Sequence, residues 1–346
     1  MATVHAPELL IIMSGSATPD QVEDVVARLD EAGVQAHVTP GKQATVIGVI
    51  GDRELIASLP LEGYPAVEQV LPILKPYKLV SREISPDPTV IQVRGRRIGD
   101  GYFGFIAGPC TVENREQTLV TARAVAAVGC TMLRGGAFKP RTSPYTFQGL
   151  GREGLEILAE AREETGLPLV TELMDPREVE PVVDTADVIQ IGARNMQNFS
   201  LLAEVGKARK PVLIKRGASA SVEELLMAAE YVVREGNAQV ILCERGIKTF
   251  ETSTRFTLDI SAIPVLKQET HLPVIVDPSH AAGRRDLVLP LARAAVAAGA
   301  DGIIVEVHPE PEHALCDAAQ QIPVADFPHF ADEIRALSSL MGKVVG

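Results

Sequence analysis

The chain has 346 residues, 46% of them hydrophobic, and a formal net charge of −12. This length and composition allow one large hydrophobic core and a small second domain. The acidic balance, with no basic tract, argues against nucleic-acid binding. No apolar run reaches the length of a membrane span, and the first residues lack the pattern of a signal peptide. We therefore expect a cytoplasmic protein that acts on small molecules.

The first 75 residues predict a small domain that mixes strands and helices. The expected strands are residues 8–13, 34–39, 44–51 and 66–74, and the expected helices are residues 18–33 and 53–59. Thr18 is suited to cap the first helix and Pro19 to occupy its first turn. The order βαββαβ is that of a ferredoxin-like α+β fold.

Two polar residues, His37 and Thr39, interrupt an apolar stretch of this first domain. They offer polar contacts to a ligand held between domains, which makes them candidate regulatory residues. An ordinary edge strand shows the same pattern, so both interpretations stay open.

Residues 75–100 mix prolines with charges and contain a short hairpin-like stretch, a composition typical of a linker and a barrel lid. We place the domain boundary near residue 88, which divides the chain into residues 1–88 and residues 89–346.

The remainder of the chain alternates apolar strands with amphipathic helices. The expected strands are 101–108, 131–138, 168–174, 187–193, 211–217, 239–246, 273–279 and 302–308. The expected helices are 115–129, 151–166, 176–183, 198–209, 221–236, 259–270, 288–299 and 327–341. Eight βα units predict an α/β fold of the closed (β/α)8 TIM-barrel type, and the uniform alternation disfavours a doubly wound sheet.

Basic residues follow several of these strands. Arg134, Lys139 and Arg141 follow the second strand, Arg194 the fourth, Lys215 and Arg216 the fifth, and Arg245 the sixth. A single such cluster is usually only a solvated loop. The carboxyl ends of the strands of a closed barrel converge, however, so the repeated pattern predicts an electropositive site for phosphate or carboxylate groups.

Potential metal ligands occupy the same strand ends. Cys110 follows the first strand, His280 the seventh, and Glu306 and Asp317 lie at or after the eighth. One thiolate, one imidazole and two carboxylates suit a divalent transition ion with an open position, and the thiolate favours zinc, iron, manganese or cobalt over magnesium. Each residue alone is weak evidence, because a lone cysteine is most often a small buried hydrophobe.

The stretch LRGGAFKPRTSPY, with its KPRTS core, resembles the phosphate-binding segment of 3-deoxy-D-arabino-heptulosonate 7-phosphate (DAHP) synthases, the first enzymes of the shikimate pathway. The resemblance covers essentially the whole barrel. It implies that the metal ligands are Cys110, His280, Glu306 and Asp317. It also implies two sets of substrate contacts: Arg134, Lys139, Arg194, Lys215 and Arg245 to phosphoenolpyruvate, and Arg141 and Thr142 to the sugar phosphate.

The activity so implied is condensation of phosphoenolpyruvate with erythrose 4-phosphate, dependent on a divalent metal ion and on no organic cofactor. From their placement, Lys139, Lys215 and Glu172 are the candidate catalytic residues, with Glu172 and Lys215 handling the water and its proton. The nearest alternative is 3-deoxy-D-manno-octulosonate 8-phosphate synthase, which has a KANRSS-type loop where this chain has KPRTS. A barrel that only binds or senses a ligand is the alternative of another class, and an intact metal set argues against it.

The resemblance also implies regulation, because feedback-regulated members of this family carry a ferredoxin-like domain and respond to aromatic amino acids. We therefore expect tyrosine or phenylalanine as effector and a homotetramer as the assembly. The four cysteines show no CxxC spacing and predict reduced thiols. Whether Cys316, beside Asp317, pairs with Cys110 once metal is lost is left open.

Overall fold

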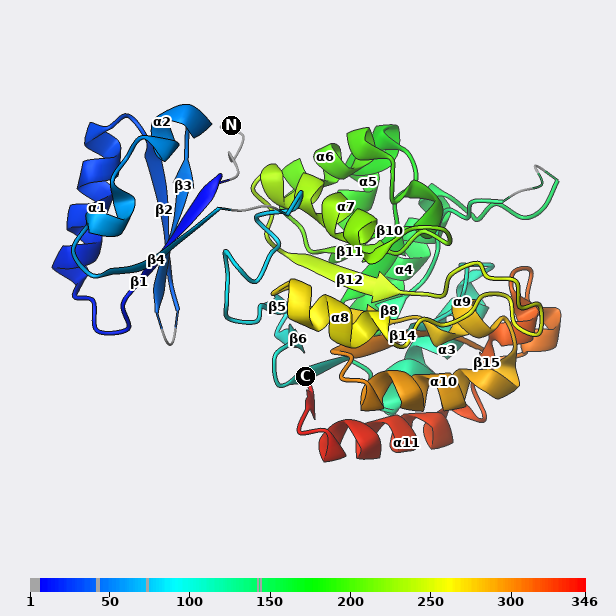
Figure 1. Cartoon of the computed structure of the whole chain (residues 1–346). Helices are drawn as coiled ribbons and strands as arrows, with labels where there is room; N and C mark the ends of the chain where they lie inside the picture. The colour runs from blue at the N-terminus through cyan, green and yellow to red at the C-terminus, as the bar shows by residue number, and fades with distance from the viewer. Residues whose placement is uncertain (1–6, 42–43, 73–74, 142, 144) are drawn as a thin grey trace.

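The protein is described by a computed structural model that covers residues 7–41, 44–72, 75–141, 143 and 145–346. A small domain formed by the first part of the chain stands beside a larger barrel, and a connecting segment joins the two (Figure 1). Within the described parts of the chain, no helix is long and apolar enough to cross a membrane.

The small domain has the expected order of elements. It contains β1 (Leu9–Met13), α1 (Pro19–Glu31), β2 (Gln35–Pro40), β3 (Thr45–Ile50), α2 (Arg53–Ala57) and β4 (Val67–Pro72). The strands form an antiparallel sheet in the order β2-β3-β1-β4, which is the ferredoxin-like arrangement. Thr18 caps α1 by accepting a hydrogen bond from the Gln21 amide, and Pro19 is the first helical residue, as predicted. A separate hydrophobic core lies between the sheet and the helices.

The connecting segment makes few contacts with the small domain and many with the barrel. Ile84 packs on Leu10 and Val46 of the small sheet, and Lys78 forms an ion pair of 2.9 Å with Glu8. On the barrel side, the carboxylate of Glu230 accepts hydrogen bonds from two backbone amides of the segment. The proposed boundary near residue 88 falls between β4 and the next strand, β5 (Val90–Val93).

The barrel consists of eight parallel strands. These are β7 (Tyr102–Gly108), β8 (Met132–Arg134), β9 (Leu169–Glu172), β10 (Val188–Ile191), β11 (Val212–Lys215), β12 (Val240–Glu244), β13 (Val274–Val276) and β14 (Gly302–His308). Each strand pairs with the next in sequence, and β14 pairs with β7, which closes the barrel. The predicted TIM barrel is confirmed.

Helices cover the outside of the barrel. They are α3 (Arg115–Ala127), α4 (Arg152–Thr165), α5 (Val179–Thr185), α6 (Phe199–Lys207), α7 (Val222–Arg234), α8 (Ala262–Glu269), α10 (Arg285–Ala297) and α11 (Phe327–Leu340). A further short helix, α9 (Pro278–Ala282), was not predicted. It forms because the Asp277 side chain accepts a hydrogen bond from the His280 amide and Pro278 supplies the first helical residue.

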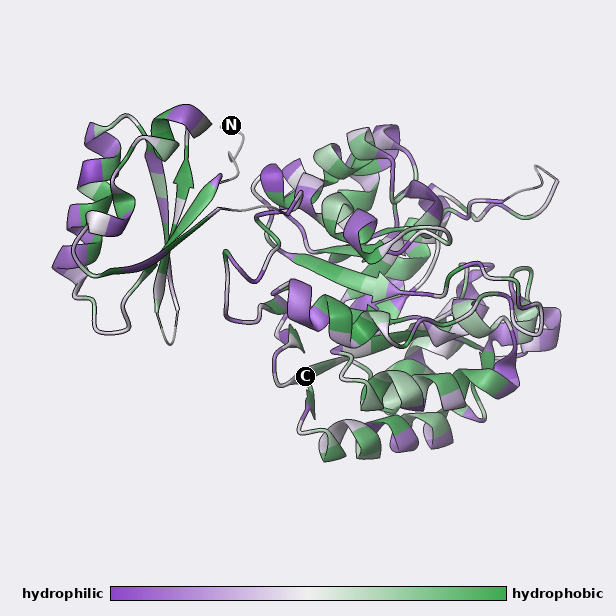
Figure 2. Ribbon diagram, viewed as in Figure 1, coloured by the Kyte–Doolittle hydropathy of each residue, from purple (hydrophilic) through white to green (hydrophobic). Residues whose placement is uncertain are grey.

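A hairpin closes the amino-terminal end of the barrel. Its strands, β5 and β6 (Arg96–Gly99), are antiparallel. Ile91, Val93 and Ile98 of the hairpin are buried in one cluster with residues from all eight barrel strands. Figure 2 shows that the barrel strands are mainly hydrophobic, whereas hydrophilic residues lie on the outer helices. The opposite, carboxyl-terminal end carries the longer loops, including the loop after β8 that extends away from the small domain (Figure 1).

Candidate functional site

A cavity of about 640 Å³ opens at the carboxyl-terminal end of the barrel. Its wall is built by loops that follow several different strands, as expected for a TIM barrel. Among the described residues, seven basic side chains line it: Arg134, Lys139, Arg141, Arg194, Lys215, Arg245 and Arg255. Glu172 and Asp317 are the acidic residues in the same wall. The predicted convergence of basic residues on one site is therefore present.

Arg134 and Lys139 of this basic set contact the neighbouring thiol and carboxylate side chains. Arg134 is the last residue of β8, and its Nη1 atom lies 2.6 Å from Oε1 of Glu306. The Lys139 ammonium lies 2.8 Å from Sγ of Cys110 and 3.2 Å from Oδ2 of Asp317. Burial lowers the pKa of Lys139, but the charges of Cys110, Glu306 and Asp317 outweigh burial and raise its pKa above the usual value. Both side chains are therefore held as cations.

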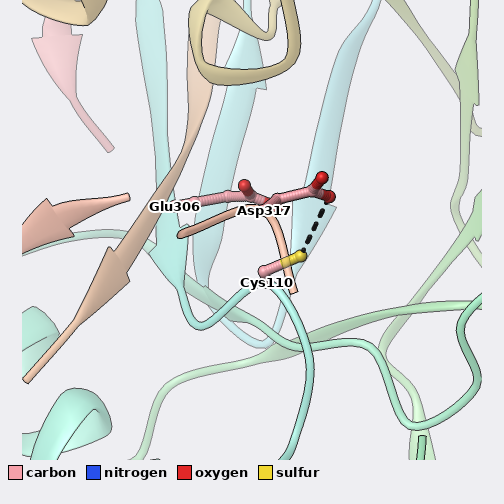
Figure 3. A group of neighbouring side chains, drawn as sticks. All are labelled: Cys110, Glu306 and Asp317. Atoms are coloured by element: carbon pink, nitrogen blue, oxygen red, sulfur yellow. Dashed lines mark hydrogen bonds between the residues drawn. The ribbon is translucent and has the colours of Figure 1, made fainter. Parts of the chain in front are cut away.

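Three of the four predicted metal ligands form one cluster (Figure 3). Donor atoms of Cys110, Glu306 and Asp317 all lie within 4.8 Å of one another. The three residues come from separate segments: the loop after β7, strand β14, and the loop after β14. Sγ of Cys110 lies 3.4 Å from Oδ2 of Asp317, the contact drawn as a dashed line in Figure 3.

The fourth predicted ligand, His280, lies beside the cluster. Its Nε2 atom is 3.4 Å from Oε1 of Glu306 and 3.9 Å from Oδ2 of Asp317. Its other ring nitrogen, Nδ1, is 2.7 Å from Oδ2 of Asp277. Burial lowers the pKa of His280 even though Asp277 and Glu306 oppose this effect. A neutral ring that donates from Nδ1 to a carboxylate presents its Nε2 lone pair to the cluster, which is the usual arrangement of a metal-binding histidine.

Charges on the surrounding residues keep both carboxylates of the cluster ionised. Burial alone would raise the pKa of Glu306, but His280, Arg134 and Lys139 bring it down to about 2. The same opposition lowers the pKa of Asp317, with Lys139 as the largest lowering cause and Arg255 as a further cation. Burial raises the pKa of the Cys110 thiol well above its usual value, and a coordinated cation would reverse this effect. The donor set therefore fits a divalent transition ion.

Lys215 and Asp277 form a buried ion pair next to His280. Burial alone would raise the pKa of Asp277, yet His280 and Lys215 lower it well below the usual value. Asp277 therefore holds both the Lys215 ammonium and the His280 ring from one carboxylate.

The other predicted catalytic and substrate residues line the same cavity. Arg245 stacks over the Phe256 ring at 4.1 Å, and Glu172 accepts a hydrogen bond of 3.3 Å from Gln190. Nε of Arg141 donates to the Thr146 hydroxyl at 3.0 Å, and Arg194 is exposed near Pro140. Thr142, also predicted to bind the sugar phosphate, lies outside the described residues.

The expectation that Arg216 belongs to the basic site is wrong. Its guanidinium forms ion pairs with Glu244 at 2.8 Å and with Asp259 at 2.9 Å, and it does not line the cavity. Successive residues of a strand point to opposite faces, so Lys215 faces the barrel interior and Arg216 faces the surrounding helices.

Sequence analysis missed Arg255, which lines the cavity and binds Oδ1 of Asp317 at 3.0 Å. It lies in a polar loop with no periodic pattern, so nothing in the sequence distinguished it. All four cysteines of the chain are free thiols, and all four are buried.

Comparison with known proteins supplies an independent line of evidence. A model of the DAHP synthetase I family matches residues 85–342, and a model of the DAHP synthase ferredoxin-like domain matches residues 9–75. The chain is 50% identical to a phospho-2-dehydro-3-deoxyheptonate aldolase of Thermotoga maritima, over 96% of this chain and 99% of the relative. A 2-dehydro-3-deoxyphosphooctonate aldolase of Syntrophotalea carbinolica is 34% identical over 71% of this chain and 96% of that protein.

Solved structures give the same picture. The crystal structure of the Thermotoga maritima phospho-2-dehydro-3-deoxyheptonate aldolase (DAHP synthase) matches with a TM-score of 0.78 and 48% identity, over 98% of this chain and all of that chain. A truncated form of 3-deoxy-D-arabino-heptulosonate 7-phosphate synthase from the same organism matches with a TM-score of 0.73 and 51% identity, over 78% of this chain and 98% of that one.

Proposed function

This chain belongs to the DAHP synthetase I family, and from that premise we infer that its barrel joins phosphoenolpyruvate to erythrose 4-phosphate. In this reaction the methylene carbon of phosphoenolpyruvate bonds to the aldehyde carbon of the sugar. Water adds to the second carbon, the bond from that carbon to the phosphate oxygen breaks, and inorganic phosphate leaves. The product is 3-deoxy-D-arabino-heptulosonate 7-phosphate, so the protein is a transferase of aromatic amino acid biosynthesis.

One observation carries this proposal: seven basic side chains converge on one cavity in a chain whose net charge is −12. The two substrates together bring two phosphates and one carboxylate. These anions repel each other, and in free solution water screens that repulsion. Arg and Lys side chains at fixed positions neutralise that repulsion and hold the two reacting carbons close.

We assign most of the cations that line the cavity to phosphoenolpyruvate, and Arg141 to the sugar phosphate. Arg134, Lys139 and Lys215 stand near the thiol and carboxylate cluster, whereas Arg141 lies in the loop at the rim. Arg194 and Arg245 complete the phosphoenolpyruvate site in this assignment. Glu172 and Lys215 are the candidates for moving the proton of the attacking water, because both line the cavity.

Cys110, His280, Glu306 and Asp317 are the residues proposed to hold a divalent ion of zinc, iron, manganese or cobalt. When bound there, the ion supplies Lewis-acid polarisation of the aldehyde carbonyl. The Asp277 carboxylate orients the His280 ring, and Arg134 and Gln320 bind the two oxygens of Glu306 at 2.6 Å each. These contacts prepare the ligands before any ion arrives.

The test is a substrate panel. Purified protein is mixed with phosphoenolpyruvate and either erythrose 4-phosphate, ribose 5-phosphate or arabinose 5-phosphate, with and without a chelator, and released phosphate is measured. Erythrose 4-phosphate should react fastest, and the chelator should stop the reaction. A preference for arabinose 5-phosphate would favour the octulosonate synthase alternative, and binding without turnover would favour a sensor.

The small domain is proposed to regulate the barrel. His37 is exposed and Thr39 is half-buried, and both lie on β2 opposite β3 residues of the same sheet. We propose that an aromatic amino acid, tyrosine or phenylalanine, binds this face. A protein lacking residues 1–88 should keep its activity and lose inhibition by both amino acids. Inhibition that survives the truncation would contradict the proposal.

A homotetramer and a cytoplasmic location remain predictions. Sedimentation equilibrium of the full chain, with and without tyrosine, measures the first, and fractionation of cells expressing the protein measures the second.

A further inference from the structure

The loop that carries Asp317 has a conformation that its own backbone does not favour. Asp317 has φ of 46° and ψ of 37°, which is the left-handed region. The left-handed region is unfavourable for a residue other than glycine, although aspartate tolerates it better than most. The loop after β14 therefore needs contacts with the rest of the protein to hold Asp317 at the ligand cluster.

One such contact comes from Glu113, three residues after Cys110. Its side chain is 6% exposed, and its Oε1 atom accepts a hydrogen bond of 2.9 Å from the backbone amide of Leu315. Leu315 lies two residues before Asp317. The carboxylate thus joins the loop that bears the thiol ligand to the loop that bears the carboxylate ligand.

The other oxygen of Glu113 faces His308, which is the last residue of β14. Nδ1 of His308 accepts the Glu310 amide at 3.0 Å, so the ring proton belongs to Nε2. Nε2 lies 3.5 Å from Oε2 of Glu113, and the His308 side chain is 5% exposed. His308 therefore lies beside the Glu113 carboxylate without a hydrogen bond from Nε2, and through Nδ1 it binds the Glu310 amide at the start of the Asp317 loop.

A second side chain, that of Gln321, also connects the Cys110 loop to the Asp317 loop. Oε1 of Gln321 accepts the Cys110 amide at 3.3 Å, and its amide nitrogen donates to the Cys316 carbonyl at 2.8 Å. Gln321 is fully buried. The hydrogen bonds of Gln321 do not involve Glu113 and remain when Glu113 is changed. A Glu113 variant is therefore expected to fold.

We propose that Glu113 is a positioning residue that clamps the Asp317 loop against the Cys110 loop and so sets the separation of these two ligand atoms. The proposal rests on the metal site described under the proposed function. Residues around a metal that orient its ligands typically contribute 10–100-fold to metal affinity. Loss of the clamp should therefore weaken metal binding by about that factor, and the activity at saturating metal should recover most of its value.

The experiment titrates metal-free protein with Co²⁺ and records the thiolate-to-cobalt absorption band. Glu113→Ala should bind Co²⁺ about 10–100-fold more weakly than the unchanged chain. Glu113→Gln keeps an oxygen that can accept the Leu315 amide, so it should restore most of the affinity. Glu116→Ala, which removes an exposed carboxylate from the first turn of α3, is the matched control and should bind as the unchanged chain does.

The other end of the hydrogen bond gives a second pair of variants. Leu315→Pro removes the amide hydrogen, and Ala314 already has the φ of −64° and ψ of 134° that suit a residue before proline. Leu315→Ala changes the same exposed side chain but keeps the amide. Only the proline variant should lose affinity, and combining it with Glu113→Ala should add little, because both remove one interaction.

Hydrogen exchange of the metal-free proteins supplies a readout that does not depend on metal. Exchange in residues 312–317 should quicken in Glu113→Ala and Leu315→Pro and stay unchanged in both controls. Equal Co²⁺ affinity in Leu315→Pro and Leu315→Ala overturns the clamp, as does a Glu113→Gln variant as weak as Glu113→Ala. Absence of a cobalt band in the unchanged chain would instead refute the metal site itself, which separates the two failures.

Discussion

The two ends of the same eight strands use buried charge in different ways. At the amino-terminal end, buried Asp301 contacts Lys267 at 2.6 Å and Lys343 at 2.8 Å and accepts the Val274 amide at 2.9 Å. These groups satisfy one another. At the carboxyl-terminal end, the described residues place seven basic side chains and two acidic ones in the wall of an open cavity. Nε of the buried Arg134 has no hydrogen-bond partner among the described residues.

This difference separates stability from function. Charges that are fully paired inside the protein hold elements together, and breaking one such pair leaves an uncompensated buried charge. Charges that converge on a cavity without equal counter-charges await a ligand of opposite sign. We therefore expect substitutions at the amino-terminal end to lower stability with little change in catalysis, and substitutions at the mouth to do the reverse.

The largest expected effect is on catalysis, from Cys110→Ser. The change removes a proposed metal ligand at the mouth, so activity should be abolished while the thermal midpoint of the metal-free protein changes by only a few degrees. Cys130→Ser is the matched control, because Cys130 is equally buried but precedes β8 at the opposite end. Steady-state phosphate release and thermal unfolding of both variants measure the contrast. Full activity of metal-free Cys110→Ser would contradict the metal role.

Asp301→Asn should have the next largest effect, and on stability alone. Two ammonium groups lose their counter-charge, which should lower the free energy of unfolding by roughly 3 kcal/mol, at the low end for a buried pair because Lys267 is 27% exposed. Urea titration measures the loss, and kcat of the folded enzyme should stay within twofold. Asp286→Asn, which breaks an exposed ion pair with Arg284, is the control. A large fall in kcat would contradict the view that charges at the amino-terminal end affect stability and not catalysis.

Arg141→Ala sharpens the assignment within the mouth. Loss of one charge-assisted contact to a phosphate should cost about 1.5–3 kcal/mol, or roughly ten- to a hundredfold in KM for erythrose 4-phosphate. The KM for phosphoenolpyruvate should change much less, because its proposed contacts do not include Arg141. Equal increases in both KM values would show that the rim does not distinguish the substrates.

The smallest predicted effect is a pH dependence at the amino-terminal end. His271 contacts the Thr89 hydroxyl through Nδ1 at 2.6 Å and the Leu79 carbonyl through Nε2 at 3.0 Å. Burial lowers the pKa of His271, and the charge of nearby Arg82 lowers it further. The hydrogen bond to the Leu79 carbonyl raises the pKa but does not outweigh burial. The unfolded chain, with a histidine pKa of about 6.5, then takes up a proton that the folded chain refuses, so stability falls as the pH drops below that value.

The free energy of unfolding should therefore be lower at pH 5.5 than at pH 7.5. Urea midpoints at pH 7.5 and 5.5 measure it, and His271→Gln, which cannot titrate, should show a smaller difference between the two values. An unchanged difference would mean that other groups cause it.

Much of this architecture followed from local patterns. The first helix starts at Pro19 because Thr18 and Pro19 are strong start signals, and strand ends placed Arg134, Lys215 and Glu306 on one side of the barrel. Such features depend on residues close in sequence and on the rule that parallel strands share a direction.

The remaining site features depend on contacts between distant segments. Arg255 reaches Asp317 from a loop 62 residues away, and Glu113 binds Leu315 across 202 residues. No periodicity encodes such pairs. The wrong prediction at Arg216 has a different cause. Adjacent residues of a strand point to opposite faces, so Lys215 and Arg216 could not both face the cavity, and the sequence alone contained this information.

The hairpin that fills the base of the barrel has a kinetic consequence. With Ile91, Val93 and Ile98 sealing that end, the mouth is the opening that the described residues leave for substrates and products. In the proposed assignment, phosphoenolpyruvate binds near Arg134 and Lys139, and the sugar phosphate binds near Arg141 in the loop at the rim. We therefore expect phosphoenolpyruvate to bind first, and product-inhibition patterns that fit a random order would contradict this expectation.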